Sequence, residues 1–180
     1  MSAGSALRLL GVAAIVAAPW GATGASARVV GGAAIDPGTP VDGMSVVQGL
    51  AQEADAGLFT DSYCDPVVTS PGRRTRTCRA IPRVRNLFVG HGVFAPKKSI
   101  AAAWNQATWQ MWIDGQRVSL SRFGHTDRWL YRYPPADFRN VVLREWSIVL
   151  VGATGRHSIR HRTHWPQGCF DTTWKFSVGR

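Results

Sequence analysis

One segment, 109–120, constrains the fold of this chain more than any other. Apolar and polar side chains alternate along it on both sides of the dipeptide Asp114-Gly115. This dipeptide favours a two-residue type I′ turn, because both central residues of that turn need a positive φ. The turn places Trp112 opposite Arg117 and gives the hairpin one apolar and one mainly polar face. Such alternation is typical of an antiparallel strand pair that is buried on one side.

The end of the chain alternates in the same way. Within 171–178, one face carries Thr172, Trp174, Phe176 and Val178. Further strand candidates are 87–93, 141–151 and 156–165. The apolar spacing across 100–107 predicts one short helix. Short strands separated by turn residues predict a mainly all-β fold, an antiparallel β-sandwich with this single helix.

Residues 143–178 resemble the last strands of secreted immunoglobulin-like modules. The resemblance rests on a long strand, on the turn Gly155-Arg156-His157 and on the closing segment 172–178. It implies an immunoglobulin-like sandwich. It implies no particular function, because such modules host many unrelated functions.

The first 27 residues have the pattern of a secretory signal peptide. Arg8 precedes the apolar stretch 9–20, and Ala25-Ser26-Ala27 supplies the small residues of a cleavage site. The apolar stretch is shorter than the roughly 20 residues that span a bilayer. The sequence therefore predicts cleavage after Ala27, no transmembrane segment, and a protein that is secreted or located in the periplasm or cell envelope.

Charge divides the remaining chain at about residue 70. Residues 28–70 carry one basic and six acidic side chains and begin with a run rich in Gly, Pro and Ala, which predicts a flexible acidic arm. Residues 71–180 carry 19 basic and five acidic side chains. Within them, 71–86 holds six arginines and is expected to form a solvated Arg-rich loop. The sandwich domain is expected to comprise 87–180.

The formal net charge of +10 raises the question of an anionic partner. Nucleic acid is the first such partner to consider. Export argues against it, because an exported protein does not normally meet genomic DNA. The charge instead favours an anionic polymer, a glycan or an envelope protein.

Three cysteines follow the cleavage site, Cys64, Cys78 and Cys169. Export permits disulfides, and three pairings are possible. We expect Cys64–Cys78, because these two are local and bracket a turn. Their bridge would close a loop of about 15 residues, which stabilises by about 3 kcal/mol in the chain-entropy model. The remaining thiol, Cys169, is expected to be a small half-buried residue at a strand start, with a nucleophile as the alternative.

Three groups of residues are candidates for binding. The Arg-rich segment suits an anionic polymer, and its alternative is a plain solvated loop. The aromatic residues of 127–139 are interleaved with arginines and suit sugar rings, with an inter-sheet crossover as the alternative. Trp112 lies on the polar face of its hairpin, either as a cation–π partner of Arg117 or as a platform for a ligand. The full set is Arg73, Arg74, Arg76, Arg79, Trp112, Arg117, Trp129, Tyr131 and Tyr133.

Motifs of hydrolases and metalloenzymes are missing from the sequence. It contains no Gly-x-Ser-x-Gly, Ser-x-x-Lys or His-Glu-x-x-His. If the chain is a hydrolase, the candidates are His125, Asp127 and Glu145. His157 and His161 would lie about 13 Å apart on a strand, too far to share a metal ion. We therefore expect neither a metal nor a cofactor.

These patterns favour an exported, non-catalytic binding or accessory module for an anionic or carbohydrate partner of the envelope. One alternative is a small exported hydrolase with a His/Asp site in a loop. The other is a structural module that packs on a larger envelope protein.

Overall fold

The computed structural model describes residues 34–65, 68, 70–129 and 140–179. Strands make up most of the regular structure, which confirms the expected all-β class. Two short helices, α1 (Ile100–Asn105) and α2 (Leu120–Phe123), and a 3-10 turn, η1 (Ala51–Glu53), connect strands. The sequence predicted α1 but not α2. In the described ranges, no helix has the length and apolar character needed to span a membrane.

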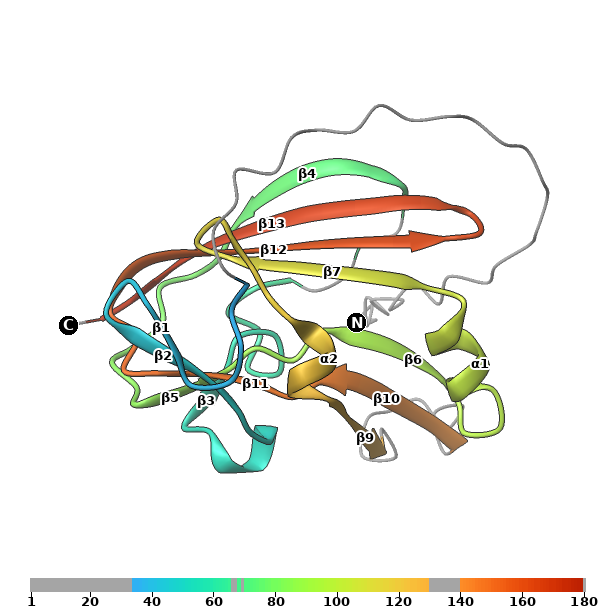
Figure 1. Ribbon diagram of the computed structural model, residues 1–180, viewed down its shortest axis with the longest axis horizontal. Helices are drawn as coiled ribbons and strands as arrows, with labels where there is room; N and C mark the ends of the chain where they lie inside the picture. The colour runs from blue at the N-terminus through green and yellow to red at the C-terminus, as the bar shows by residue number, and fades with distance from the viewer. Residues whose placement is uncertain (1–33, 66–67, 69, 130–139, 180) are drawn as a thin grey trace, which may run out of the picture.

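The first layer of the fold is a five-stranded sheet in the order β4-β13-β12-β7-β8 (Figure 1). Its strands are β4 (Gly72–Thr77), β7 (Thr108–Ile113), β8 (Gln116–Arg117), β12 (Gly155–Trp165) and β13 (Gly168–Val178). The two long strands, β12 and β13, form an antiparallel hairpin that is paired along its whole length. This hairpin is the centre of the layer.

The second layer contains two sheets, β1-β2-β11-β5-β3 and β6-β10-β9. Consecutive strands β10 and β11 carry the chain from one sheet into the other, and both sheets lie on the same side of the first layer (Figure 1). The strands are β1 (Thr39–Val41), β2 (Met44–Gln48), β3 (Ala56–Gly57), β5 (Asn86–Phe88), β6 (Gly92–Pro96), β9 (His125–Trp129), β10 (Val141–Trp146) and β11 (Ile148–Val151).

The core lies between the two layers. Ile159, Trp174 and Phe176 come from the inner face of the first layer, and all three are buried. Val46 and Leu150 come from the second layer and belong to the same apolar cluster. The predicted alternation of 171–178 is confirmed, because its four even-numbered residues are all buried.

The hairpin at Asp114-Gly115 also forms as predicted. Asp114 has φ 47° and Gly115 has φ 81°, as a type I′ turn requires. Trp112 is the cross-strand partner of Arg117. The second strand of the pair is short, because the chain turns into α2 at Leu120.

The expected flexible arm is corrected for residues 34–65, which are folded. They supply β1, β2, β3 and several core side chains. Asp42, with φ 44°, and Gly43, with φ 82°, form the same kind of turn as Asp114-Gly115 and join β1 to β2. Strand β2 then pairs with β11, and its side chains Met44 and Val46 are buried in the core. Burial of these apolar side chains holds a segment that its Gly, Pro and Asp content suggested would be loose.

The expected Arg-rich loop is also corrected, because its first part is strand β4. This strand pairs in parallel with β13, and Cys78 N–H continues the pairing by donating to the carbonyl oxygen of Lys175 at 2.8 Å. A second parallel pair joins β3 and β5, so the sheets are mixed rather than purely antiparallel. Alternating Arg and Thr side chains suit a strand at a sheet edge, where charge discourages pairing with another chain.

Candidate functional site

The candidate site is the outward side of the five-stranded sheet. Side chains alternate across a strand, and residues paired between strands share a face. Because Ile159 and Trp174 point into the core, their chain neighbours point outward. We call the resulting surface the outer basic face; it consists of Arg73, Trp112, Arg117, Arg156, Arg160, Arg162, Asp171 and Lys175.

Asp171 is the centre of this face. Its oxygens accept hydrogen bonds from Arg160 Nε at 2.7 Å and Nη2 at 2.5 Å, and Arg162 Nη2 donates to the same carboxylate at 3.0 Å. The Arg160 hydrogen bond lowers the pKa of Asp171, and Arg162 adds to this effect. Asp171 is only 4% exposed as a residue, and its carboxylate stays ionised beneath the two guanidiniums and fixes their positions.

Trp112 lies beside this ion-pair cluster. The guanidinium of Arg160 stacks over the indole at 4.8 Å from the ring centroid, and that of Arg162 lies at 6.0 Å. The cation–π partner is therefore Arg160 on the neighbouring strand rather than Arg117, which was one of the two alternatives for Trp112. The indole is half-buried and braced, so a flat aromatic surface is presented among cations.

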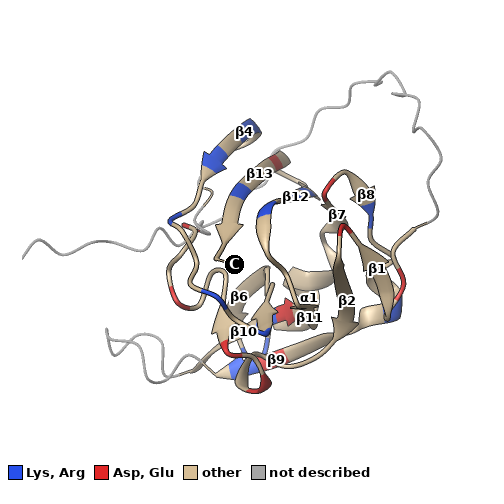
Figure 2. Ribbon diagram, turned by 90° about the vertical axis from the view of Figure 1, so that its left-hand side faces the viewer, with Lys and Arg blue, Asp and Glu red and all other residues tan. Residues whose placement is uncertain are grey.

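The face carries six cationic side chains and one buried carboxylate. In the described part of the chain, Arg73, Arg117, Arg156 and Lys175 have no carboxylate within 4 Å. Lys and Arg positions mark β4, β8, β12 and β13 in Figure 2. A cationic surface of this kind attracts anions and can hold a ring against its aromatic member.

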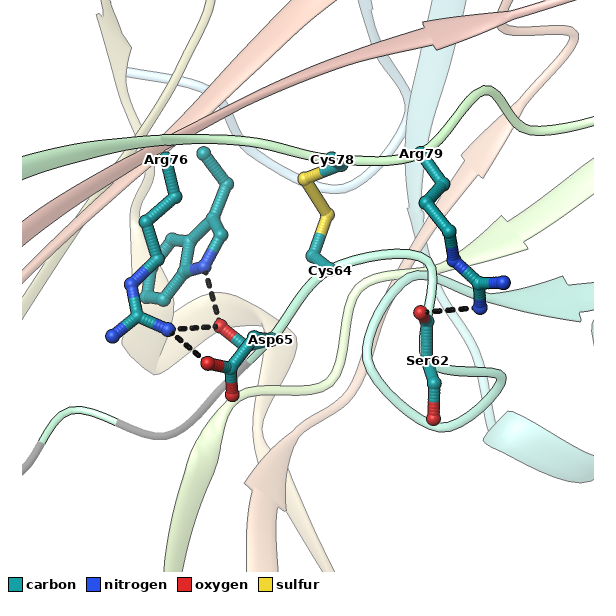
Figure 3. The surroundings of a disulfide bond; sticks show 7 residues. Ser62, Cys64, Asp65, Arg76, Cys78 and Arg79 are labelled. Carbon is teal, nitrogen blue, oxygen red and sulfur yellow. Dashed lines mark hydrogen bonds and ion pairs between the residues drawn. A yellow bond between two sulfur atoms is a disulfide. The ribbon is translucent and has the colours of Figure 1, made fainter.

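Two of the other predicted arginines brace the disulfide rather than the outer basic face. Arg76 Nη1 donates to the carboxylate of Asp65 at 2.5 Å, and Arg79 Nη2 donates to the carbonyl oxygen of Ser62 at 2.7 Å (Figure 3). The bridge Cys64–Cys78 lies between these contacts and confirms the predicted pairing. Both arginines therefore fasten the 62–65 segment to the end of β4.

Arg74 turns back along its own chain. Its Nη2 donates to the carbonyl oxygens of Ser70, at 2.5 Å, and Pro71, at 3.2 Å. Of the four arginines expected to bind a ligand together, only Arg73 lies on the outer basic face. A loop could have presented all four together, but strand β4 places Arg74 and Arg76 on the side opposite Arg73, and Arg79 lies beyond the end of the strand.

Trp129, the exposed aromatic candidate for binding, lies away from the outer basic face. Trp129, at the end of β9, is 41% exposed, and Lys97 Nζ lies 5.1 Å from its ring centroid. Tyr131 and Tyr133, which were expected to join it, lie outside the described residues. Trp129 is in the second layer, so it does not extend the outer basic face.

The hydrolase candidates are on paired strands, β9 and β10, rather than in a loop. Arg144 binds both oxygens of Asp127, at 2.6 and 2.8 Å, and this lowers the pKa of that carboxyl. Glu145 points to the other side of β10, where burial raises its pKa and Arg128 contacts it at 3.2 Å. Burial and the nearby Arg144 lower the pKa of His125. The three groups do not converge, since the register separates Glu145 from the other two.

The histidines of β12 have three different environments. His157 Nδ1 lies 2.8 Å from Asp114 Oδ2, and this hydrogen bond raises the pKa of the imidazole. His161 is buried, and His164 is exposed next to the free, half-buried Cys169, with Nε2 3.6 Å from Sγ. In the described ranges, His, Cys, Asp and Glu nowhere form a group of three that could hold a metal ion.

Five members of the outer basic face were not singled out as binding residues from the sequence: Arg156, Arg160, Arg162, Asp171 and Lys175. Their signal was present in the alternation of 156–165, where every even-numbered residue is polar, and in that of 171–178, where every odd-numbered residue is polar. What joined them to Trp112 is the pairing of β12 with both β7 and β13, which is a long-range property.

Comparison of the chain with protein-family models, with curated proteins and with solved structures found no match in any of the three.

Proposed function

We propose that the protein is an exported, non-catalytic binding module that holds an anionic or carbohydrate partner of the cell envelope on its outer basic face. One observation carries the proposal. Six cations and an aromatic ring lie on one solvated sheet surface, and their single carboxylate, Asp171, is buried beneath two of them. Such a surface leaves uncompensated positive charge pointing to solvent.

The geometry supports binding better than hydrolysis. A general base must reach the proton that it removes, with a free acceptor atom. Asp127 uses both of its oxygens on Arg144, and Glu145 lies on the opposite side of the strand. The outer basic face, by contrast, has donors that point to solvent. A partner of the envelope fits a cationic surface better than nucleic acid, given the expected export.

The immunoglobulin-like sandwich and the export of the protein belong to the same proposal. An immunoglobulin-like sandwich is supported by the two facing layers and by the long closing hairpin β12–β13. Export after cleavage at Ala27 is supported by the Cys64–Cys78 bridge, because structural disulfides persist in oxidising compartments. N-terminal sequencing of the protein recovered from outside the cytoplasm tests export and cleavage after Ala27. An uncleaved or cytoplasmic chain would contradict both.

The binding test is salt elution from heparin and dextran sulfate, used as anionic probes. The triple variant Arg73→Ser/Arg117→Ser/Lys175→Ser removes three cations of the outer basic face that have no carboxylate partner in the described chain. We expect it to elute at roughly half the salt concentration of the unchanged protein, since each lost contact reduces a screened attraction.

A control variant distinguishes binding by the outer basic face from attraction by the net charge of the protein. Arg83→Ser/Lys98→Ser/Arg122→Ser removes the same charge from exposed positions elsewhere. We expect its elution to stay within about a tenth of the unchanged value. Equal weakening by the two triple variants would mean that only net charge matters, and the proposal would be wrong.

A further inference from the structure

Two histidines meet inside the fold, between the two layers. His161 comes from β12 of the first layer, and His91 comes from the connection between β5 and β6 of the second. Their ring centroids are 4.1 Å apart, with the ring planes at 81°. The remaining histidines of the described chain, His125, His157 and His164, make no such contact with one another.

Aromatic side chains enclose this pair. Phe59 lies 5.6 Å from His91 and 6.4 Å from His161, and Trp174 lies within 5.5 Å of both, measured between ring centroids. Trp109 contacts the His91 ring from the side of β7 at 6.4 Å. His161 is 3% exposed, and although His91 is partly exposed as a residue, its Nδ1 is buried.

Neither imidazole has an acceptor for a second proton. His91 Nδ1 and His161 Nε2 are buried atoms without a hydrogen-bond partner among the described residues. The centroid separation is too short for a shared metal ion, because two imidazoles on one ion place their centroids roughly 4.5–6 Å apart, given metal–nitrogen bonds of about 2.0–2.1 Å. The geometry therefore does not suit a metal ion shared by the two rings, and the buried nitrogens favour the neutral form of both.

Charged side chains from β10 and β4 lie near the pair. From β10, Glu145 approaches Gly90 but is held by Arg128, and from β4, Arg76 is paired with Asp65 beside Trp174. Arg74, also on β4, is a second cation near the pair. It is paired in register with Thr172, which is the cross-strand neighbour of His161. Strand β7 contributes Trp109, and the 58–59 segment contributes Phe59, neither of which titrates. Among the described residues, no hydrogen bond or ion pair joins a carboxylate to either imidazole, so none stabilises an imidazolium there.

We propose that the contact between His91 and His161 makes the packing of the two layers acid-sensitive, so that protonation of either imidazole loosens the 89–91 segment from β12. This segment is otherwise tied to the second layer by backbone hydrogen bonds, from Val89 N–H to Ile148 at 2.8 Å and from Trp146 N–H to His91 at 3.2 Å. The first layer holds it through side-chain packing. A charge in that packing is costly, because the buried nitrogens His91 Nδ1 and His161 Nε2 have no partner there.

The direction of the pH dependence follows from burial. Desolvation lowers the pKa of His91 to about 4 and that of His161 well below its usual value, the latter also because of the charge that His91 would carry. The unfolded chain binds these protons from about pH 6.5 downward. Stability is therefore complete above pH 6.5 and is lost as the pH falls toward 4, since the unfolded state binds more protons there.

Urea unfolding of the whole protein between pH 7.5 and pH 5, followed by tryptophan fluorescence, tests the proposal. His91 alone should raise the unfolding equilibrium constant roughly 30-fold at pH 5 relative to pH 7.5. The double variant His91→Phe/His161→Phe keeps two aromatic rings and removes both protonation sites. We expect its change over the same range to be at least tenfold smaller.

The control variant is His164→Phe, and the second measurement is NMR titration of the histidines. His164→Phe changes an exposed histidine of the same strand and should leave the pH dependence as in the unchanged protein. NMR titration of the unchanged protein should show no protonation of His91 or His161 above about pH 5, and this result holds even if the double variant does not fold. Titration of both rings near pH 6.5, or an acid dependence equal in the double variant, would overturn the proposal.

Discussion

Asp171 lies beneath Arg160, with its two carboxylate oxygens 2.7 and 2.5 Å from Nε and Nη2 of the guanidinium. The same guanidinium stacks on Trp112, so one buried carboxylate orients both a cation and an aromatic ring of the outer basic face. Strands β13, β12 and β7 each contribute one of these three residues. The arrangement therefore depends on the correct pairing of three strands.

Replacing Asp171 with Asn should destabilise the protein and weaken its binding of anionic polymers. The substitution leaves Arg160 and Arg162 side by side without their counter-charge, and we expect a loss of about 2 kcal/mol in unfolding free energy at pH 7. Urea unfolding measures this loss. Because the Asp171 pKa is lowered in the fold, its stabilisation is complete above the unfolded value near pH 4 and is lost as pH falls further.

The Asp171→Asn variant also tests whether the Asp171 carboxylate stabilises the fold and positions Arg160. Unfolding of the unchanged protein should show an acid-dependent loss below pH 4 that is smaller in Asp171→Asn. Heparin retention should fall although the substitution makes the face more positive, because Arg160 and Trp112 are no longer held in place. Tighter retention by the variant would show that charge alone governs binding.

Opening the Cys64–Cys78 bridge should loosen β4 before the rest of the fold. The cysteines are 14 residues apart in sequence, and for a loop of this size the chain-entropy model predicts a stabilisation of about 3 kcal/mol. We expect Cys64→Ser/Cys78→Ser to lose about this much unfolding free energy. Hydrogen exchange should accelerate most in 72–77, and uniform acceleration across both layers would contradict this localisation.

Gly92 permits a close approach of two backbones that a side chain would block. A Cβ atom there would overlap the carbonyl oxygen of Arg144, the residue beside its cross-strand partner Glu145. Gly92→Ala should therefore cost about 2–3 kcal/mol, measured by urea unfolding, because backbone must shift. Gly43→Ala is the comparison: it has open space but a φ of 82°, so only about 1 kcal/mol of strain is expected. Equal costs would contradict this view.

Local patterns predicted the parts of the fold that local geometry determines. The turn at Asp114-Gly115, the inward residues of 171–178 and the helix at 100–105 follow from dihedral preferences and periodicity. The turn at Asp42-Gly43 carries the same signal within a segment whose Gly, Pro and Ala content predicts a flexible arm. Composition was a poorer guide there than the dipeptide itself.

Long-range pairing explains what the sequence did not predict. Nothing local indicates that β4 joins β13 in parallel, which divides the arginines of 73–76 between two sides of a strand. The outer basic face and the His91–His161 contact likewise bring together residues from segments far apart in the chain. Sequence reasoning found Arg73, Trp112 and Arg117, because each stood out locally, and missed Arg160 and Asp171, whose role depends on their neighbours across the sheet.

His157 should oppose the acid sensitivity proposed for the buried pair. Its imidazole lies 2.8 Å from Asp114 Oδ2, and this hydrogen bond raises its pKa. The folded state then holds a proton that the unfolded chain releases above about pH 6.5. The stabilisation is therefore complete below pH 6.5 and is lost as pH rises through the folded value. His157→Gln should lose about 1–2 kcal/mol at pH 6 and less at pH 9. Urea unfolding at the two pH values measures this difference, and an equal loss at both would show that the ion pair with Asp114 contributes nothing.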